Sequence, residues 1–332
     1  MPLRKFYGRK HEEEIFREEF DLADRLGSGR LIAVAGRRRI GKTALVLQCL
    51  NERREVPCIY LFCSRLTQGA LLKAWSRSVM EALDLPFLPR FERLAQIVEY
   101  LLAVGKERRI NICIDECQGL NACEPSFRQE LLSAWDRNRK SSKTVLVLVK
   151  SGTAAMEARS EDPDRPLDGS VDRFIALKPF PLRVEAEILD DYAPNAANDD
   201  LLALHVLTGG VVWLIEDLME RGAVDLSRMA DAVFRSGSKF IMDAESHLTN
   251  EFHGEASGSR TILRALAFGK TKREDLQEEL GSVSVSGFLS RLEKSCRLIA
   301  PHRPVLSPNY RQTIAGFAMG LEIVISRGGL LS

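Results

Sequence analysis

The chain has 332 residues, of which 45% are hydrophobic and 28% are charged, and this length exceeds what a single core usually fills. We therefore expect two or three domains, and the composition excludes a long disordered region. Lysine and arginine number 47 against 46 aspartate and glutamate, so any surface for nucleic acid or membrane would have to be local.

The cysteines and the ends of the chain indicate a cytoplasmic protein. Seven cysteines form no CxxC pair and no Cys/His cluster with zinc spacing, which predicts reduced thiols. The N-terminal MPLRKFYGRKHEEE lacks the apolar stretch of a signal peptide. Residues 314–325 are apolar but too short for a membrane span and contain Glu322. We expect no membrane contact.

The first predicted elements are an amphipathic helix and five buried strands. Residues 11–26 place apolar side chains at helical spacing. The glutamates of this helix are expected to form a solvated face: Glu12, Glu13, Glu14, Glu18 and Glu19. From Leu31 to about Phe180, short β-branched runs then alternate with longer amphipathic segments, as in a parallel sheet covered by helices. The predicted strands are residues 31–35, 58–62, 110–114, 145–149 and 174–177.

GRRRIGKT, residues 36–43, lies between the first predicted strand and a helix predicted over residues 44–51. The spacing Gly36-x4-Gly41-Lys42-Thr43 in this setting is that of a phosphate-binding loop, or Walker A motif. Lys42 would reach the β- and γ-phosphates and Thr43 would ligate Mg²⁺, although a glycine turn that happens to precede Lys-Thr is the alternative. The residues expected around the nucleotide are Gly36, Arg37, Arg38, Arg39, Ile40, Gly41, Lys42, Thr43 and Ala44.

Arg37, Arg38 and Arg39 are consecutive arginines inside this loop. Because backbone N–H groups of such a loop face the nucleotide, the side chains between the glycines are expected to point away from it. The three guanidinium groups could then pair with carboxylates of later domains or of another subunit, and so link nucleotide state to domain arrangement. The alternative is a solvated basic tip without a partner.

Acidic and polar residues end the next strands. Asp115 would hold Mg²⁺ through water, and Glu116 would orient or activate the attacking water, as in the Walker B motif of nucleoside triphosphatases. By itself this acidic pair could merely end a strand and cap the next segment of the chain. Ser151 or Lys150, at the end of the fourth strand, is the candidate sensor of the γ-phosphate, and either could be an ordinary loop residue.

The rest of the chain predicts an exposed loop and two further domains. Residues 158–173 are polar and contain two prolines, which predicts the loop. Helices are then predicted over residues 183–192, 199–207, 211–221 and 225–252, followed by a turn-rich boundary at 254–259. Helical patterns at 261–268, 272–280 and 283–292, with a pair of short strands in RLIAPHRPVL, are typical of a winged helix-turn-helix. The expected domains are residues 1–180, 181–256 and 257–332.

The last of these domains is locally basic. Residues 260–311 contain ten lysines and arginines against five acidic residues. This excess favours double-stranded DNA as a partner through Arg291, Lys294 and Arg303, with the helix over residues 283–292 also presenting Ser284 and Ser286 to a groove. The alternative is that the domain packs against the sheet or binds protein.

Four segments together resemble the archaeal-type ATPase family, which belongs to the signal-transduction ATPases with numerous domains (STAND) and is close to the AAA+ proteins. They are FYGRKHEEE at residues 6–14, AGRRRIGKT at 35–43, CIDECQGL at 113–120 and LKPFPLR at 177–183. The resemblance implies an α/β fold: a P-loop NTPase parallel sheet with helices on both faces, followed by a helical lid and a winged helix. It also implies a switch that depends on ATP and Mg²⁺.

The resemblance implies roles for single residues as well. It assigns the γ-phosphate sensor to Ser151 and supports the phosphate, metal and water roles given above. It also implies that four N-terminal residues lie beside the adenine: Phe6, Tyr7, Gly8 and Arg9.

This chain departs from the family pattern in three places. Gly169-Ser170 replaces a Gly-Arg pair, Val212 replaces the proline of Gly-Gly-x-Pro, and the aromatic-rich extension after Tyr310-Arg311 is missing. We therefore expect slow or partner-stimulated ATP hydrolysis, with a protein partner or self-association possible. The competing hypothesis is an AAA+-like, ATP-dependent DNA-binding initiator or transposition-type regulator.

Overall fold

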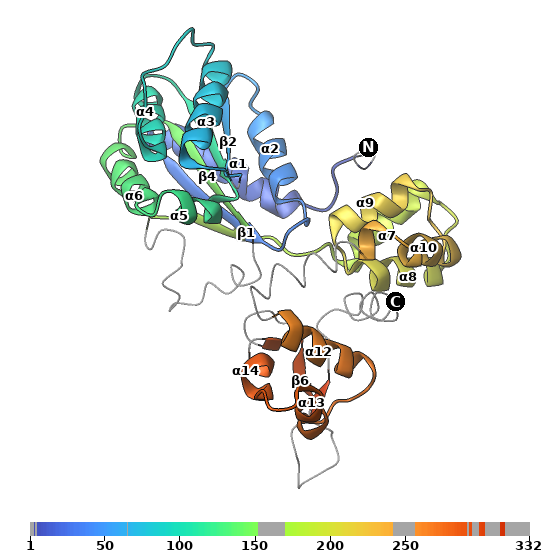
Figure 1. Cartoon of the computed structure of the whole chain (residues 1–332). Coiled ribbons are helices and arrows are strands. Elements are labelled where there is room, and N and C mark those ends of the chain that lie inside the picture. The colour runs from blue at the N-terminus through green and yellow to red at the C-terminus, as the bar shows by residue number, and fades with distance from the viewer. Residues whose placement is uncertain are drawn as a thin grey trace. The chain divides into compact units, whose positions relative to one another are not determined.

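The chain packs as two compact units, Arg9–Lys178 and Met1–Gly8 together with Pro179–Ser332 (Figure 1). The computed structural model describes residues 3, 5–64, 66–151, 170–241, 256–290, 292–293, 299–302 and 313–315. Residues 1–8 therefore group with the unit that follows the sheet. From their position in the sequence they were expected to belong to the first domain. The domain boundaries expected from the sequence remain predictions.

A parallel five-stranded sheet forms the centre of the first unit, with the strand order β2-β3-β4-β1-β5. β1, β3 and β4 are buried along nearly their whole length, as expected for strands that are covered on both faces. The five predicted strands are confirmed, with ends shifted by no more than two residues. They are β1 Arg30–Gly36, β2 Cys58–Phe62, β3 Ile110–Asp115, β4 Thr144–Ser151 and β5 Arg173–Ala176.

Helices cover both faces of this sheet (Figure 1). α1 (Lys10–Leu26) and α2 (Lys42–Asn51) pack on one face, where Phe16 and Leu45 share a core with alternate side chains of β1 and β4. The other face packs against helices around Trp75 and Trp135, because successive side chains of a strand point to opposite faces. These helices are α3 (Gln68–Leu83), α4 (Leu94–Glu107) and α6 (Phe127–Asn138), and the short η1 (Cys117–Gly119) and α5 (Leu120–Cys123) lie between α4 and α6 in the chain.

Glu19 of α1 lies inside the protein. Its carboxylate is fully buried and accepts hydrogen bonds from Arg30 Nε at 2.6 Å and from Arg173 Nε at 2.7 Å. The expectation that all the glutamates of this helix form a solvated face is therefore wrong for Glu19. The reason is that the first residues of β1 and β5 supply two arginines to the buried side of the helix. Arg173, expected in an exposed loop, instead begins β5.

Four helices form an apolar core in the second unit: α7 (Leu182–Tyr192), α8 (Asn198–Thr208), α9 (Val212–Glu220) and α10 (Leu226–Phe234). The helix predicted over residues 225–252 is not continuous, because α10 ends at Phe234 and helical conformation resumes at residues 239–241. The sequence Ser-Gly-Ser lies in the break, and Gly237 adopts a left-handed φ of 72°, which interrupts a helix. Residues 242–252 lie outside the described residues.

The C-terminal part has a separate core around Ile262, Leu276 and Leu292. It contains α12 (Ala256–Ala267), α13 (Arg273–Leu280), α14 (Val285–Ser290) and the antiparallel pair β6 (Ala300–His302) and β7 (Thr313–Ala315). The first strand predicted within residues 297–306 corresponds to β6, which pairs with β7 further along the chain, and the second lies outside the described residues. These elements suit the winged-helix assignment, which remains a prediction.

Part of the turn predicted at residues 254–259 is helical, because α12 begins at Ala256. A Cβ on Gly258 would lie 2.5 Å from Cζ of Phe288, so this glycine allows α12 to pack directly against that ring. Tertiary packing therefore overrides the local turn preference here. None of the helices in the described ranges combines the length and the apolarity that crossing a bilayer requires.

We predict that Glu19→Ala lowers the free energy of unfolding by about 2–3 kcal/mol, because two arginines would lose a buried carboxylate and only part of that charge reaches solvent. Chemical denaturation with a far-UV circular dichroism readout would measure this change. Glu14→Ala, on the exposed face of the same helix, is the matched control and should change stability by less than about 0.5 kcal/mol. Equal effects of the two substitutions would contradict the structural role of Glu19.

Candidate functional site

The predicted phosphate loop connects β1 to α2 and is tightly packed. β1 ends at Gly36, and Gly41 precedes α2 with a left-handed φ of 87°. A Cβ on Gly36 would lie 2.6 Å from Cδ1 of Ile40 and 2.6 Å from the carbonyl oxygen of Leu177, so this position admits only glycine. Arg39 is also left-handed, with a φ of 67°, a conformation that costs a non-glycine residue on the order of 1 kcal/mol.

Lys42 is a buried cation at the start of α2. Its side chain is 5% exposed, and its Nζ donates a hydrogen bond to the carbonyl oxygen of Arg37 at 2.7 Å. Burial lowers the pKa of Lys42 to about 8, while the nearby Glu116 and Asp115 act in the opposite direction. Because the hydrogen-bond acceptor of this ammonium group is a neutral carbonyl, an anion that entered the loop would gain a strong partner.

Asp115 ends β3 and joins three elements. Its Oδ2 accepts hydrogen bonds from Thr43 Oγ1 at 2.6 Å and from Tyr60 Oη at 2.7 Å. Its Oδ1 accepts from the backbone N–H of Glu116 at 2.8 Å. Burial and the bond to Asp115 raise the pKa of Tyr60 above its usual range. The carboxylate is therefore held in one direction by the first turn of α2, by β2 and by the backbone after β3.

Glu116 contacts the end of β4. Its Oε1 accepts a hydrogen bond from Ser151 Oγ at 2.6 Å, and its Oε2 accepts one from Gln118 Nε2. Gln118 Oε1 in turn accepts from the backbone N–H of Ser151 at 3.2 Å. Ser151 is paired in register with Gly36 of β1. Of the two sensor candidates, Ser151 and Lys150, the structure therefore brings Ser151 to Glu116.

Two residues of this arrangement, Tyr60 and Gln118, were not predicted from the sequence. Tyr60 lies in the middle of β2, where a tyrosine is an ordinary strand residue, and only strand pairing brings it to Asp115. Gln118 follows Glu116 by two residues, in a segment without helical or strand periodicity. The spacing of polar residues after a buried strand was the only signal available for Gln118, and no such signal marked Tyr60.

The remaining residues of the loop differ in exposure. Ile40 is fully buried, Arg37 is half-buried, and Arg38, Arg39 and Ala44 are exposed. Partial desolvation of its guanidinium group and the neighbouring Arg38 lower the pKa of Arg39. The expected pairing of these arginines with carboxylates of other domains or subunits stays a prediction.

The four N-terminal residues expected beside the adenine are divided between the two units. Phe6, Tyr7 and Gly8 belong to the second unit and Arg9 to the first. Tyr7 is 2% exposed and donates a hydrogen bond to Asp191 Oδ2 at 2.8 Å, whereas Phe6 is 39% exposed. Contact of these residues with adenine stays a prediction.

The residues expected to contact DNA are only partly described. Arg291, Lys294 and Arg303 lie outside the described residues. Ser284 and Ser286 are exposed, as a groove contact requires.

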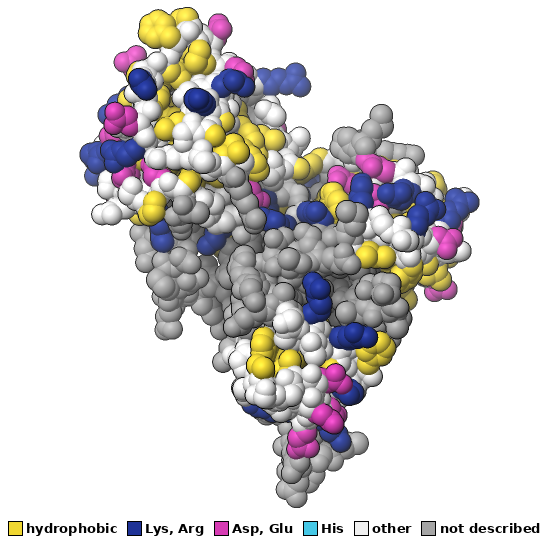
Figure 2. Space-filling view, in the orientation of Figure 1, with side chains coloured by type: hydrophobic (Ala, Val, Ile, Leu, Met, Phe, Trp, Pro, Cys, Tyr) yellow, Lys and Arg dark blue, Asp and Glu magenta, His cyan; other side chains and the backbone are white. Residues whose placement is uncertain are grey.

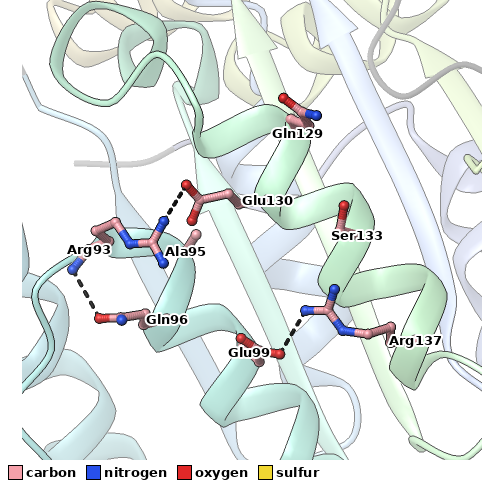
Figure 3. Close-up of a pocket in the computed structure, with 8 residues that line it drawn as sticks. All are labelled: Arg93, Ala95, Gln96, Glu99, Gln129, Glu130, Ser133 and Arg137. Carbon is pink, nitrogen blue, oxygen red and sulfur yellow. Dashed lines mark hydrogen bonds and ion pairs between the residues drawn. The ribbon is translucent and has the colours of Figure 1, made fainter.

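A polar groove between α4 and α6 is separate from these residues (Figure 3). Arg93 bonds to Glu130 at 2.6 Å and Arg137 bonds to Glu99 at 2.8 Å across it. Because each arginine is already matched by a glutamate, the groove has no excess positive charge to attract a phosphate. We therefore place the candidate site at the loop between β1 and α2 and at the ends of β3 and β4.

No family model matches the chain. A curated relative, the uncharacterized protein MJECL04 of Methanocaldococcus jannaschii, is 24% identical over 283 residues, which are 83% of this chain and 57% of that protein. The chain thus spans little more than half the length of that relative.

Among solved structures, the chain is similar to the Walker-type ATPase PABY2304 of Pyrococcus abyssi. The TM-score is 0.70 at 18% identity, and the match covers 98% of both chains. It is also similar to Cdc6p from Pyrobaculum aerophilum, with a TM-score of 0.50 at 15% identity over 98% of this chain and 94% of that one. Together with the sheet order and the loop, these likenesses show that the chain has the α/β fold of a P-loop NTPase, as predicted.

We predict that Tyr60→Phe lowers the free energy of unfolding by about 1–3 kcal/mol, because the substitution removes a hydrogen bond to the buried carboxylate of Asp115 and leaves the ring in place. Denaturant titration would measure the change. Tyr100→Phe, on α4, is the matched control for loss of a tyrosine hydroxyl away from the site. A Tyr60→Phe protein as stable as the wild type would show that this hydrogen bond contributes nothing net.

Proposed function

We propose that this protein is a switch that binds ATP with Mg²⁺, hydrolyses it slowly, and changes the arrangement of its domains with the nucleotide state. One observation carries the proposal. Lys42, the Thr43–Asp115 pair and the Glu116–Ser151 pair meet at the carboxyl ends of three adjacent strands, β3, β4 and β1. In open α/β sheets, ligands bind outside these strand ends.

The residues present suit a nucleoside triphosphate and its metal ion. A Cβ at Gly36 would clash with Ile40 and with the carbonyl of Leu177, so glycine permits the tight backbone turn that a phosphate loop needs. Lys42 supplies a buried positive charge. The hydroxyl of Thr43 and the carboxylate of Asp115 are hard oxygen ligands of the kind that Mg²⁺ prefers. A bound Mg²⁺ would neutralise charge on the β- and γ-phosphates.

Glu116 and Ser151 support turnover and sensing. Hydrogen bonds from Ser151 and Gln118 hold both oxygens of Glu116, so this carboxylate has a fixed direction from which to orient a water and accept its proton. The hydroxyl of Ser151 could donate to a γ-phosphate oxygen instead of to Glu116. Presence or loss of the γ-phosphate would then change the contacts at the end of β4.

The alternative function is that of an ATP-dependent DNA-binding initiator or transposition-type regulator. In residues 256–290, five lysines and arginines stand against four acidic residues. Figure 2 shows both signs of charge interspersed on the visible face of this part. The predicted basic excess therefore depends on residues outside the described part, which include Arg291, Lys294 and Arg303. For this reason we place the ATP-dependent switch first.

Binding assays separate the two functions. A switch should respond to ATP and to a protein partner or a second copy of the chain, with no requirement for DNA. Binding to double-stranded DNA that weakens steeply as salt is raised, and that depends on ATP, would favour the alternative.

We predict that ATP affinity falls as the pH rises above about 8, because the phosphates bind the protonated form of Lys42 and each pH unit above that pKa costs up to about tenfold in affinity. Lys42→Arg keeps its charge at every accessible pH and should give a flat profile. Lys42→Ala should abolish binding. Titration with a fluorescent ATP analogue between about pH 6.5 and pH 9.5 would measure these affinities. A wild-type profile as flat as that of Lys42→Arg would refute the prediction.

We predict that Glu116→Gln retains ATP binding and loses turnover by about a hundredfold or more, because an amide does not accept a proton from water. Phosphate release under single-turnover conditions measures the chemical step, and equilibrium titration measures binding. Glu107→Gln, at the end of α4, is a matched control for the loss of one glutamate charge and should keep the wild-type rate. An unchanged rate in Glu116→Gln would move the catalytic role to another residue.

A further inference from the structure

The chain crosses between its two units twice, once between Gly8 and Arg9 and once between Lys178 and Pro179. At the first crossing, the residues on both sides are tightly packed. A Cβ on Gly8 would lie 2.6 Å from Cγ1 of Val184 in the second unit, and the φ of Gly8 is 66°, so the backbone is packed closely before it leaves that unit. Arg9, the next residue, is 5% exposed in the first unit.

The second crossing is equally short. The backbone N–H of Leu177 donates to the carbonyl of Ala35 at 2.8 Å, which continues the β1–β5 pairing in the first unit. Three residues later, the N–H of Phe180 donates to the carbonyl of Gly210 at 2.8 Å in the second unit. Only Lys178 and Pro179 lie between these two anchored positions.

The side chain of Arg9 joins both crossings to the phosphate loop. Its Nη1 donates to the carbonyl oxygen of Lys178 at 2.9 Å, and its Nη2 donates to the carbonyl oxygen of Ile40 at 3.0 Å. Glu12, one turn along α1, forms an ion pair with the same guanidinium group at 3.7 Å. One buried side chain therefore contacts both the phosphate loop and the segment that follows β5. The residue that carries it, Arg9, is the first residue of the first unit.

The carbonyl of Ile40 lies in the part of the loop that must adjust when a phosphate enters. Lys42 Nζ now bonds to the carbonyl of Arg37, and this bond would be given up when the ammonium group turns to a phosphate. Residues 38–41 lie between the two partners of that bond, and the carbonyl of Ile40 is among them. A change in this backbone therefore reaches the guanidinium group of Arg9 through the Ile40 carbonyl.

We propose that Arg9 is a positioning residue that transmits nucleotide occupancy of the phosphate loop to both chain crossings. The proposal rests on the proposed function, because it needs a nucleotide to enter this loop. The proposed role runs through the backbone, since two nitrogens of Arg9 donate to backbone carbonyls. A planar guanidinium group suits this role because it donates in two fixed directions.

Hydrogen–deuterium exchange of the full chain tests the proposal, with Mg²⁺ and the non-hydrolysable analogue AMP-PNP as the probe. Peptides that cover residues 36–44 report nucleotide binding, and peptides that cover residues 6–9 and 177–180 report the two crossings. The variants are Arg9→Gln and Arg9→Lys. Arg17→Gln is the matched control, because Arg17 lies on α1, which begins directly after Arg9, and because it is exposed and pairs with Glu52 instead of the loop.

In the wild type and in Arg17→Gln, AMP-PNP is expected to change exchange in the loop and at both crossings. At AMP-PNP concentrations that saturate each variant, the loop of Arg9→Gln should still respond and the response at the crossings should be lost. Arg9→Lys keeps the charge without the planar fork and should give a smaller response at the crossings than the wild type. It supplies this comparison even if Arg9→Gln does not fold.

Two results would overturn the inference while leaving ATP binding intact. One is a full response at both crossings in a folded Arg9 variant. The other is a wild-type protein whose loop responds to AMP-PNP while neither crossing does. Failure of the wild-type loop to respond at all would instead remove the proposed function, and the inference with it.

Discussion

The carboxylate of Asp115 is the interaction on which the rest of the site depends. It is 2% exposed and accepts hydrogen bonds from Thr43, Tyr60 and the N–H of Glu116. A buried carboxylate is costly unless donors satisfy it, so these three donors are constrained to meet at one place. That constraint sets the start of α2 against the end of β3, and it fixes the direction in which the chain continues to Glu116.

The sheet brings the other members of the site to the same place. Parallel strands end at one edge, and the register pairs Gly36 of β1 with Ser151 of β4. Glu116 then bridges from β3 to β4 through Ser151. The left-handed φ of 56° at Glu116 is a cost that this set of contacts sustains. Lys42, the Thr43–Asp115 pair and Glu116 thus come together through the strand order and one satisfied buried charge.

The sequence was most informative where a motif coincided with a change of periodicity. All five strands were predicted because continuous apolar runs mark strands that are buried on both faces. Lys42, Thr43, Asp115, Glu116 and Ser151 were named because each lies where a predicted strand or loop ends. The structure brings them together, and the chemical roles that they were given are part of the proposed function.

Residues defined by tertiary pairing were beyond this kind of prediction. Glu19 follows the helical pattern of its charged neighbours, and only the two arginines of β1 and β5 make its burial possible. Tyr60 and Gln118 acquire their contacts from residues that are distant in sequence, Asp115 for Tyr60 and Ser151 for Gln118. The end of α10 at Phe234 likewise depended on a single glycine, Gly237. The pairing of β6 with β7 joins strands that residues 303–312 separate in the chain.

The buried Glu19 also bears on β5, which lies at the edge of the sheet in the described part of the chain. β5 is the last strand in the order, has only four residues and begins with Arg173, one of the two partners of Glu19. Exposed sheet edges invite pairing with other chains, and short, charged edge strands resist it. By holding the first residue of β5 against α1, Glu19 keeps this strand in its register on β1. The ion pair that is expected to stabilise the fold therefore also favours an edge strand of the kind that resists pairing with other chains.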